Sequence, residues 1–332
     1  MPTFEQVHEA YRQRLAKSRP NSPRAFYEIM VPRFAIPAAS LPFTIGSVLA
    51  AYRTGLFNWP VFLVSSVTVF LIMTAVNACN TYFDYETDLQ NHEFSAYSGG
   101  IRILVEGKIT NRRHALYFAC ALMGLACPLG LSLYFLLHTG PWTLGLGFLG
   151  ALAGWFYTAP PFKLVYRGLG ELVIAGGSGI LTVVTGYYLQ AGRFDLAILP
   201  LAVALAAGIL NVILINEYAD RRSDARSGKM TWLVRLGPER AARLYQANQV
   251  VTLVALVLAP FLGVPWYAAL GAAALAARLA WRNRRQMAAG LWAGDGINEL
   301  TLNTFAVHLL VELGLLVGLL LALGLRAVGI AS

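Results

Sequence analysis

Long apolar stretches separated by short bursts of charge constrain the fold of this chain more than any other feature. A membrane-spanning helix needs about 20 predominantly apolar residues, and several windows of this sequence reach that length. Only 13% of the 332 residues are charged and 57% are hydrophobic, whereas a soluble domain carries about 25% charged residues. The chain is therefore predicted to be an all-α, polytopic membrane bundle.

The apolar windows predict about nine transmembrane helices. They lie at residues 34–52, 59–79, 115–137, 142–157, 170–189, 196–218, 244–262, 264–280 and 302–323. Some of these stretches are short or closely joined, notably 142–157 with 170–189 and 244–262 with 264–280. A count of eight or ten therefore stays open.

The distribution of basic residues predicts the orientation. If the N-terminus is cytoplasmic, 23 of the 26 Lys and Arg residues fall on the cytoplasmic side, and Arg53, Arg193 and Arg326 fall on the other. This asymmetry follows the positive-inside rule and places the C-terminus outside. The net charge of +9 thus belongs to membrane loops and gives no reason to expect a nucleic-acid partner.

Two regions follow from this reading. Residues 1–33 are predicted to form a basic cytoplasmic segment, and residues 34–332 a single transmembrane domain. The first segment has no apolar stretch ahead of a small-residue cleavage site, so no secretory signal is expected. Its basic side chains are expected to face anionic membrane lipid: Arg12, Arg14, Lys17 and Arg19.

An internal repeat carries the chemistry. The pattern N-x-x-x-D-x-x-x-D follows both the second and the sixth apolar stretch: Asn80, Asp84 and Asp88, then Asn216, Asp220 and Asp224. Residues four apart share one helix face, so each motif stacks an amide and two carboxylates that repel each other. A divalent cation would offset that repulsion, and Mg²⁺ is typically held by one or two carboxylates together with substrate phosphates.

A plainer interpretation treats these aspartates as ordinary solvated residues at helix ends. For one motif the two interpretations are evenly matched. Two copies on the same side of the membrane favour function, because acidic residues near membrane depth are costly. Each motif also precedes a basic, glycine-bearing loop, which contains Arg102 and Lys108 in the first case and Lys229 in the second. These side chains are predicted to neutralise a diphosphate.

The motifs resemble those of the UbiA superfamily of intramembrane prenyltransferases. The resemblance implies a nine-helix bundle around a central cavity, in which the six motif residues bind Mg²⁺ and the diphosphate of a polyprenyl donor. It also implies diphosphate contacts from Arg33, Arg102, Lys108, Tyr157 and Lys229, and a catalytic role for Lys163 beside the four aspartates. Such an enzyme is expected in the bacterial inner membrane, with its site facing the cytoplasm.

One branch of the superfamily looks closer than the others. The stretch Tyr166-Arg-Gly-Leu-Gly-Glu171 resembles the 1,4-dihydroxy-2-naphthoate polyprenyltransferases of menaquinone biosynthesis, as does Gly228-Lys-Met-Thr231. The resemblance implies an aromatic acceptor, whose carboxylate Arg167 is predicted to orient. Thr81 and Ala219 depart from the usual pattern.

Other outcomes stay open at this point. The same site would suit a terpene cyclase or transfer to a non-aromatic acceptor, and a magnesium-linked transporter is a more distant possibility. Among polar residues inside the apolar stretches, Asn77 and Asn211 are expected either to line the cavity or to bond between helices. His308 and Glu312 are expected to pair with each other inside the bundle.

Overall fold

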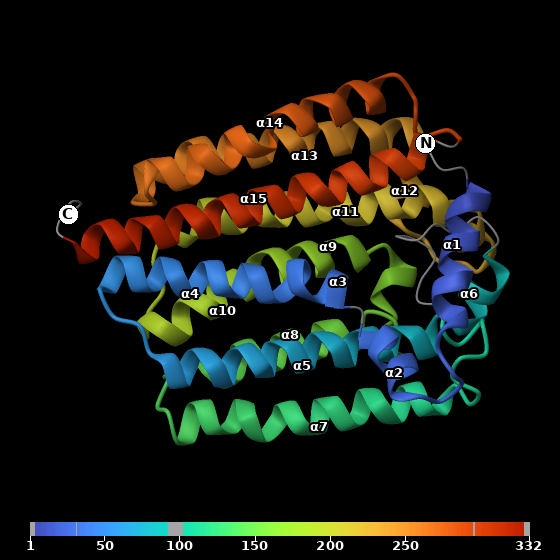
Figure 1. Ribbon diagram of the computed structural model, residues 1–332, viewed down its shortest axis with the longest axis horizontal. Coiled ribbons are helices and arrows are strands. Elements are labelled where there is room, and N and C mark those ends of the chain that lie inside the picture. Colours follow the sequence, from blue (N-terminus) through green and yellow to red (C-terminus); the bar gives the residue numbers. More distant parts are fainter. Residues whose placement is uncertain (1–3, 31, 92–101, 295, 329–332) are drawn as a thin grey trace.

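The structure is a computed structural model that describes residues 4–30, 32–91, 102–294 and 296–328. In these ranges every regular element is a helix, and the long helices lie side by side along one axis (Figure 1). In chain order they are α1 (Phe4–Ala16), α2 (Pro23–Met30), α3 (Pro32–Ala35), η1 (Ile36–Ser40), α4 (Leu41–Thr54), α5 (Trp59–Phe83), α6 (Tyr85–Gln90), α7 (Arg113–Phe135), α8 (Trp142–Trp155), η2 (Leu164–Arg167), α9 (Gly170–Ile174), η3 (Ala175–Leu181), α10 (Thr182–Ala191), α11 (Ile198–Arg226), α12 (Trp232–Leu236), α13 (Pro238–Leu258), η4 (Ala259–Leu262), α14 (Trp266–Ala288) and α15 (Gly296–Ala327).

The predicted multi-pass membrane bundle is confirmed, but its helix count is not. In the described residues, 6 helical runs are long and apolar enough to cross a membrane: Trp59–Phe83, Arg113–Phe135, Gly170–Ala191, Ile198–Arg226, Pro238–Leu262 and Gly296–Ala327. The helix Trp142–Trp155 is apolar but shorter. The predicted stretches 34–52 and 264–280 also fall on helices outside this set. Nine crossings therefore stay a prediction.

Local sequence explains why the predicted stretches 34–52 and 264–280 fall outside this set. The first predicted span begins with the π-helical turn η1, which contains Pro37, and Pro42 lies at the start of α4. Proline removes a backbone donor, and one-turn π segments interrupt otherwise regular helices. The span is consequently divided into short pieces. Helix α14 is 23 residues long but carries several arginines in its second half, which lower its hydropathy.

Both aspartate motifs lie at the same end of the bundle. The short elements α1, α2, α6 and α12 gather at the right-hand end in Figure 1, whereas α15 finishes at the opposite end. Helix α5 ends at Phe83 and α11 at Arg226, so each delivers its motif to this end. Residues 4–30 and 324–328 thus lie at opposite ends, as an odd number of crossings requires.

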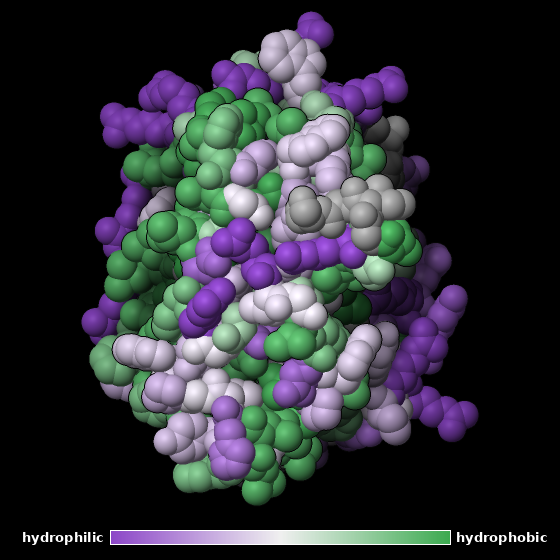
Figure 2. All heavy atoms as spheres, turned by 90° about the vertical axis from the view of Figure 1, so that its left-hand side faces the viewer, coloured by the Kyte–Doolittle hydropathy of each residue, from purple (hydrophilic) through white to green (hydrophobic). Residues whose placement is uncertain are grey.

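The other end of the bundle carries a band of polar side chains within a mainly hydrophobic surface (Figure 2). Arg53 pairs with Asp195 across 3.3 Å, and Asn58 and Gln190 exchange two hydrogen bonds of 2.8 and 3.1 Å. These contacts join the turns that follow α4 and α10. Polar groups therefore cap the apolar helices at both ends, as expected where helices emerge from a membrane.

Small residues let the helices approach closely. Gly186 of α10 lies so near α4 that an added Cβ would stand 2.0 Å from the Phe43 carbonyl oxygen. Gly314 and Gly318 of α15 face α14 in the same way, against Ala272 and Ala268. Small residues four apart are typical of helix contacts inside membranes, where packing replaces the hydrophobic effect. The positions of α14 and α15 thus depend on these glycines.

We predict that Gly318→Ala destabilises the fold while Gly324→Ala on the same helix does not. A Cβ at Gly318 would lie 2.4 Å from the Ala268 Cα, whereas a Cβ at Gly324 meets nothing within 4 Å. Overpacking of this kind costs about 1–3 kcal/mol. Thermal unfolding of the two purified variants in one detergent tests this. Equal midpoints would contradict the close packing of α14 on α15.

Candidate active site

The first motif follows one stripe across the junction of α5 and α6. Asp84 is the residue between the two helices, and its backbone N–H donates to the Asn80 carbonyl at 2.8 Å. The Asp88 N–H donates in turn to the Asp84 carbonyl at 2.8 Å. The helical hydrogen-bond pattern therefore continues through the junction, and the three side chains stack as predicted. The second motif lies wholly within α11.

Lys229 joins the two motifs. Its Nζ lies 3.3 Å from Asp84 Oδ2 in the first motif and 3.9 Å from Asp224 Oδ1 in the second. Burial by itself would lower the pKa of Lys229, but the Asp84 and Asp224 carboxylates outweigh it and raise that pKa well above its ordinary value. Lys229 is therefore a fixed cation between two acidic clusters.

Three further hydrogen bonds hold the motifs together. Asn91 Nδ2 donates to Asp220 Oδ1 at 2.8 Å, and Ser223 Oγ donates to the Thr87 carbonyl at 3.1 Å. The Tyr166 hydroxyl donates to Asp84 Oδ1 at 3.2 Å. Burial and the Asp84 charge raise the pKa of Tyr166, so its hydroxyl keeps its proton and remains a donor.

Arg102 supports the first motif from the basic loop. It is buried and donates to the carbonyl oxygens of Asp88 and Asn91 at 2.7 and 3.0 Å. It therefore fixes the backbone at the end of α6. Asp88 itself is buried, and burial followed by repulsion from Asp84 raises the pKa of Asp88 well above its ordinary range. The Lys229 and Arg102 charges act in the opposite direction but do not offset the burial of Asp88.

The residues of the two motifs fit a magnesium ion whose remaining ligands are supplied by substrate and water. In the described residues, no three His, Cys, Asp or Glu side chains converge into a ready-made metal site. Mg²⁺ does not require one, because it is usually bound by one or two carboxylates with waters and phosphate oxygens. The Asn216 Oδ1 is buried and has no hydrogen-bond partner among the described residues. A buried oxygen without a hydrogen-bond partner, one helical turn from Asp220, is a suitable ligand for a hard cation.

The remaining predicted residues lie around this centre at different distances. Tyr157 is buried and, with Asn80, lines a cavity of about 140 Å³. Lys163 is exposed, and its Nζ lies 5.3 Å from the centre of the Tyr166 ring. Arg167 is also exposed and donates to the Pro161 carbonyl at 3.2 Å. Their roles stay predictions.

The positions of two further predicted residues leave their roles as predictions. Among the described residues, the backbone of Lys108 is hydrogen-bonded to Asn21 and Ile103. Arg33 belongs to α3, but its side chain lies outside the described part of the chain.

The cavity beside Tyr157 and Asn80 adjoins a larger apolar groove. The cavity lies between α5, α8 and the run α9–η3–α10. Asn77 lines it and also bonds between helices, because its Nδ2 donates to the Met30 carbonyl at 3.3 Å. A groove of about 1020 Å³ lies next to it, between α5, α7, α8 and α10. The two spaces share four lining residues: Val69, Ile72, Gly147 and Thr185. Asn211 lies elsewhere and bonds between helices, because its Nδ2 donates to the Tyr245 carbonyl at 3.1 Å.

The loop that carries Lys229 is held by two buried glutamates that sequence reasoning did not single out as site residues. Glu217 of α11 accepts from the Leu233 N–H at 3.1 Å, and Glu171 at the start of α9 accepts from the Trp232 N–H. The Glu171 and Glu217 side chains are 1% and 5% exposed as residues and lie against each other. Acidic residues inside apolar stretches are a signal that could have found them.

The backbone of the Tyr166–Glu171 stretch completes this support. The Met230 N–H donates to the Tyr166 carbonyl at 3.3 Å, and Trp232 Nε1 donates to the Gly168 carbonyl at 3.0 Å. Arg235 donates to the Arg167 carbonyl at 2.8 Å. The two stretches that resembled one branch of the superfamily are thus bonded to each other, and together they position Lys229.

Fold and site define an integral membrane enzyme with paired aspartate motifs at one end of a helical bundle. The chain belongs to the UbiA prenyltransferase family, whose profile matches residues 40–293, and it is a prenyltransferase. It is 32% identical over 246 residues to a 1,4-dihydroxy-2-naphthoate octaprenyltransferase of Mycobacterium tuberculosis, covering 74% of this chain and 81% of that protein.

Solved structures share the fold. A UbiA homologue from Aeropyrum pernix superimposes with a TM-score of 0.65 at 20% identity, covering 85% of this chain and 97% of that one. A UbiA homologue from Archaeoglobus fulgidus, bound to GPP and Mg²⁺, gives a TM-score of 0.59 at 16% identity, covering 88% and 99%. These structures confirm the fold, and the family match together with the M. tuberculosis relative confirms the predicted family.

We predict that Glu217→Leu weakens binding of the prenyl diphosphate through Lys229, whereas Glu217→Gln preserves it. Leucine removes the acceptor of the Leu233 N–H, so the loop loses one anchor, while glutamine keeps an acceptor of the same length. Steady-state kinetics should show KM for the diphosphate rising about fivefold with a smaller change in kcat, because a net hydrogen bond is worth roughly 0.5–1.5 kcal/mol. Equal KM values for the two variants would contradict this positioning role.

Proposed function

We propose that this enzyme transfers a polyprenyl group from an isoprenyl diphosphate to 1,4-dihydroxy-2-naphthoate, with Mg²⁺, in menaquinone biosynthesis. The observation that carries the diphosphate site is Lys229, held between Asp84 and Asp224. A cation at this position and carboxylates able to hold metal ions suit a highly charged diphosphate leaving group. The naphthoate acceptor is supported by the M. tuberculosis relative, and magnesium by the A. fulgidus structure.

In this proposal the two motifs hold Mg²⁺ through carboxylate and amide oxygens: Asn80, Asp84, Asp88, Asn216, Asp220 and Asp224. When bound, the metal supplies Lewis-acid neutralisation of the diphosphate. Lys229 adds a fixed charge beside it, with Tyr157, Lys163 and Arg102 around the same end of the bundle. Arg33 and Lys108 are proposed to complete the diphosphate contacts.

The chemistry then follows from charge. The allylic carbon–oxygen bond breaks, and its electron pair leaves with the neutralised diphosphate. The carboxylate-bearing ring carbon of the acceptor attacks the resulting allylic cation and forms the new carbon–carbon bond. The bond from that carbon to the carboxylate then breaks, carbon dioxide leaves, and the electron pair of the broken bond restores the aromatic ring. Arg167 is proposed to orient that carboxylate before it leaves, since a guanidinium matches a carboxylate in two hydrogen bonds.

The cavity beside Asn80 and Tyr157 shields the cation from water. It adjoins the apolar groove between α5, α7, α8 and α10. This groove has a volume of about 1020 Å³, which is large enough to take an isoprenoid tail. Exposed apolar side chains such as Phe148 and Leu131 border the groove. The tail is therefore proposed to lie there and to reach the lipid sideways.

We predict that turnover requires Mg²⁺ and both motifs. Purified protein in nanodiscs would receive radiolabelled geranylgeranyl diphosphate and 1,4-dihydroxy-2-naphthoate, and diphosphate release and lipid-soluble product would be followed separately. Asp84→Ala and Asp220→Ala are each expected to lower kcat roughly 100-fold or more, as loss of a charge-stabilising group does. Asp195→Ala, at the opposite end of the bundle, is the matched control.

The outcomes separate the alternatives. Diphosphate release without prenylnaphthoquinone would move the proposal to another acceptor, and hydrocarbon formed without any acceptor would indicate a cyclase. No turnover of any prenyl diphosphate, with magnesium binding retained, would support a transporter.

We also propose that the chain crosses the bacterial inner membrane nine times, with the motif-bearing end in the cytoplasm. Nearly all Lys and Arg residues lie at that end. A C-terminal fusion to alkaline phosphatase, which is active only outside the cytoplasm, is therefore expected to be active, and a fusion truncated after Gly228 to be inactive. The reverse pattern would overturn this orientation.

A further inference from the structure

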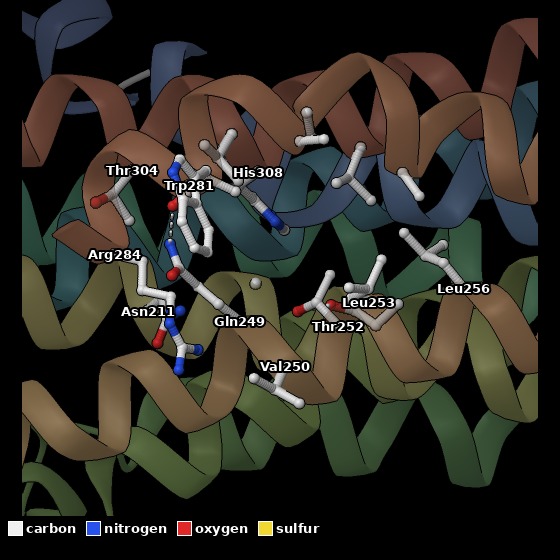
Figure 3. A pocket seen from close by; sticks show the side chains of 18 of the residues that line it. Asn211, Gln249, Val250, Thr252, Leu253, Leu256, Trp281, Arg284, Thr304 and His308 are labelled. Atoms are coloured by element: carbon white, nitrogen blue, oxygen red, sulfur yellow. Dashed lines mark hydrogen bonds between the residues drawn. The ribbon is translucent and has the colours of Figure 1, made fainter.

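A second cavity lies in the other half of the bundle, away from the aspartate motifs. It has a volume of about 500 Å³, within the roughly 300–1,000 Å³ range of ligand pockets, and is enclosed by α11, α13, α14 and α15 (Figure 3). It shares no lining residue with the cavity at Asn80 and Tyr157. Nothing in the proposed reaction uses it.

The lining of this cavity changes from polar to apolar along the helix direction. Arg284, Asn211 and Gln249 lie together at one side in Figure 3, and Leu253 and Leu256 extend away from them. The polar side is nearer the end of the bundle that carries the motifs, because α13 begins there and runs from Gln249 towards Leu256. A ligand that fits must therefore have a polar head near this end and an apolar tail.

Helix α14 provides the space for the tail. Four of its six cavity-lining residues are small: Ala273, Ala276, Ala277 and Ala280. On the opposite wall, Val250 and Leu253 are 45% and 51% exposed, so the cavity communicates with the surrounding lipid along α13. His308 also lines the cavity, and its Nε2 lies 3.3 Å from Glu312 Oε1 without a hydrogen bond. The part of the cavity beside Leu253, Leu256 and Val311 is apolar and suits hydrocarbon.

The charge at the mouth is positive and unbalanced. Arg284 is partly buried, and its hydrogen bond is a long one of 3.5 Å to the Gln246 carbonyl. Helix α14 contains no acidic residue. Of its other arginines, Arg282 pairs with Glu299, while Arg278 and Arg285 make no ion pair within the described ranges. Arg278, Arg282 and Arg285 form a basic surface on α14. The exposed ring of Trp281 lies between this surface and the cavity, as expected at a membrane interface.

We propose that this cavity binds one acidic phospholipid, with its phosphate at Arg284 and one acyl chain among the alanines of α14. Basic pockets between membrane helices on the cytoplasmic side match anionic lipid headgroups, and the neighbouring arginines add to the attraction. The polar-to-apolar lining gives the lipid one orientation. An ordinary lipid of the surrounding shell would meet the outer surface of α14 but not this interior.

Native mass spectrometry of the delipidated protein tests this site. The protein would be titrated with phosphatidylglycerol and with phosphatidylcholine of identical acyl chains. One phosphatidylglycerol is expected to bind at least about fivefold more tightly than phosphatidylcholine, since a basic charge near an anionic headgroup contributes about that factor. Arg284→Gln should remove this preference, and Arg243→Gln, an exposed arginine of α13 outside the cavity, should keep it.

A second pair of variants tests the tail separately from the charge. Ala273→Phe fills the cavity and is expected to weaken both lipids, whereas Ala274→Phe, an exposed neighbour that does not line it, leaves both unchanged. Size exclusion and thermal unfolding confirm that each variant is folded. Equal affinities for the two lipids, or equal effects of cavity and control variants, would overturn the site. One-for-one displacement of phosphatidylglycerol by a prenylated naphthoquinone of higher affinity would overturn the phospholipid assignment.

Discussion

The active end of this protein depends on gathering like charges at the edge of a membrane. Asp84, Asp88, Asp220 and Asp224 all lie at that end, although two unit charges close together repel by several kcal/mol where water is scarce. Lys229 reduces that repulsion by standing 3.3 Å from Asp84 and 3.9 Å from Asp224. Because removing one partner of a buried pair leaves the other charge uncompensated, the site is stable only when the lysine loop is in place. A diphosphate with its metal ions would add charges of both signs to this balance.

The lysine loop in turn depends on helices far from it in sequence. Glu217 of α11 and Glu171 of α9 each accept a backbone N–H at the start of α12, so the loop cannot move without leaving buried carboxylates unpaired. Helices α11 and η3 are close enough for this because Gly179 lies against the Ala206 backbone. The helix contacts made by small residues therefore determine, through the two glutamates, where Lys229 lies between the motifs.

Patterns local in sequence could be predicted, and contacts distant in sequence could not. The apolar stretches and the four-residue spacing of both motifs are visible directly, and they led to the membrane bundle, the paired site and the family. The contact of Lys229 with Asp84 joins residues 145 positions apart, and no spacing rule reveals it. Arg102 was predicted to contact diphosphate, and that contact stays a prediction. In the structure Arg102 donates to the Asp88 and Asn91 carbonyls, a supporting role that the sequence alone does not reveal. The first span illustrates the remaining difficulty, because its prolines divide one apolar stretch into three helical elements.

Helix α11 connects the catalytic end with the second cavity. Ala204, Gly208 and Asn211 line that cavity, and Asp220 follows Asn211 by nine residues, about 14 Å along a helix axis. The helix between them is continuous, so a displacement along or about its axis at one site is transmitted to the other. Asn211 is bonded to Tyr245 and Asn248 of α13, which fixes α11 to the wall that an acyl chain would press upon. Lipid in the cavity would thus hold α11 in one position relative to α13. Because the second aspartate motif lies within α11, its position would be fixed in the same way.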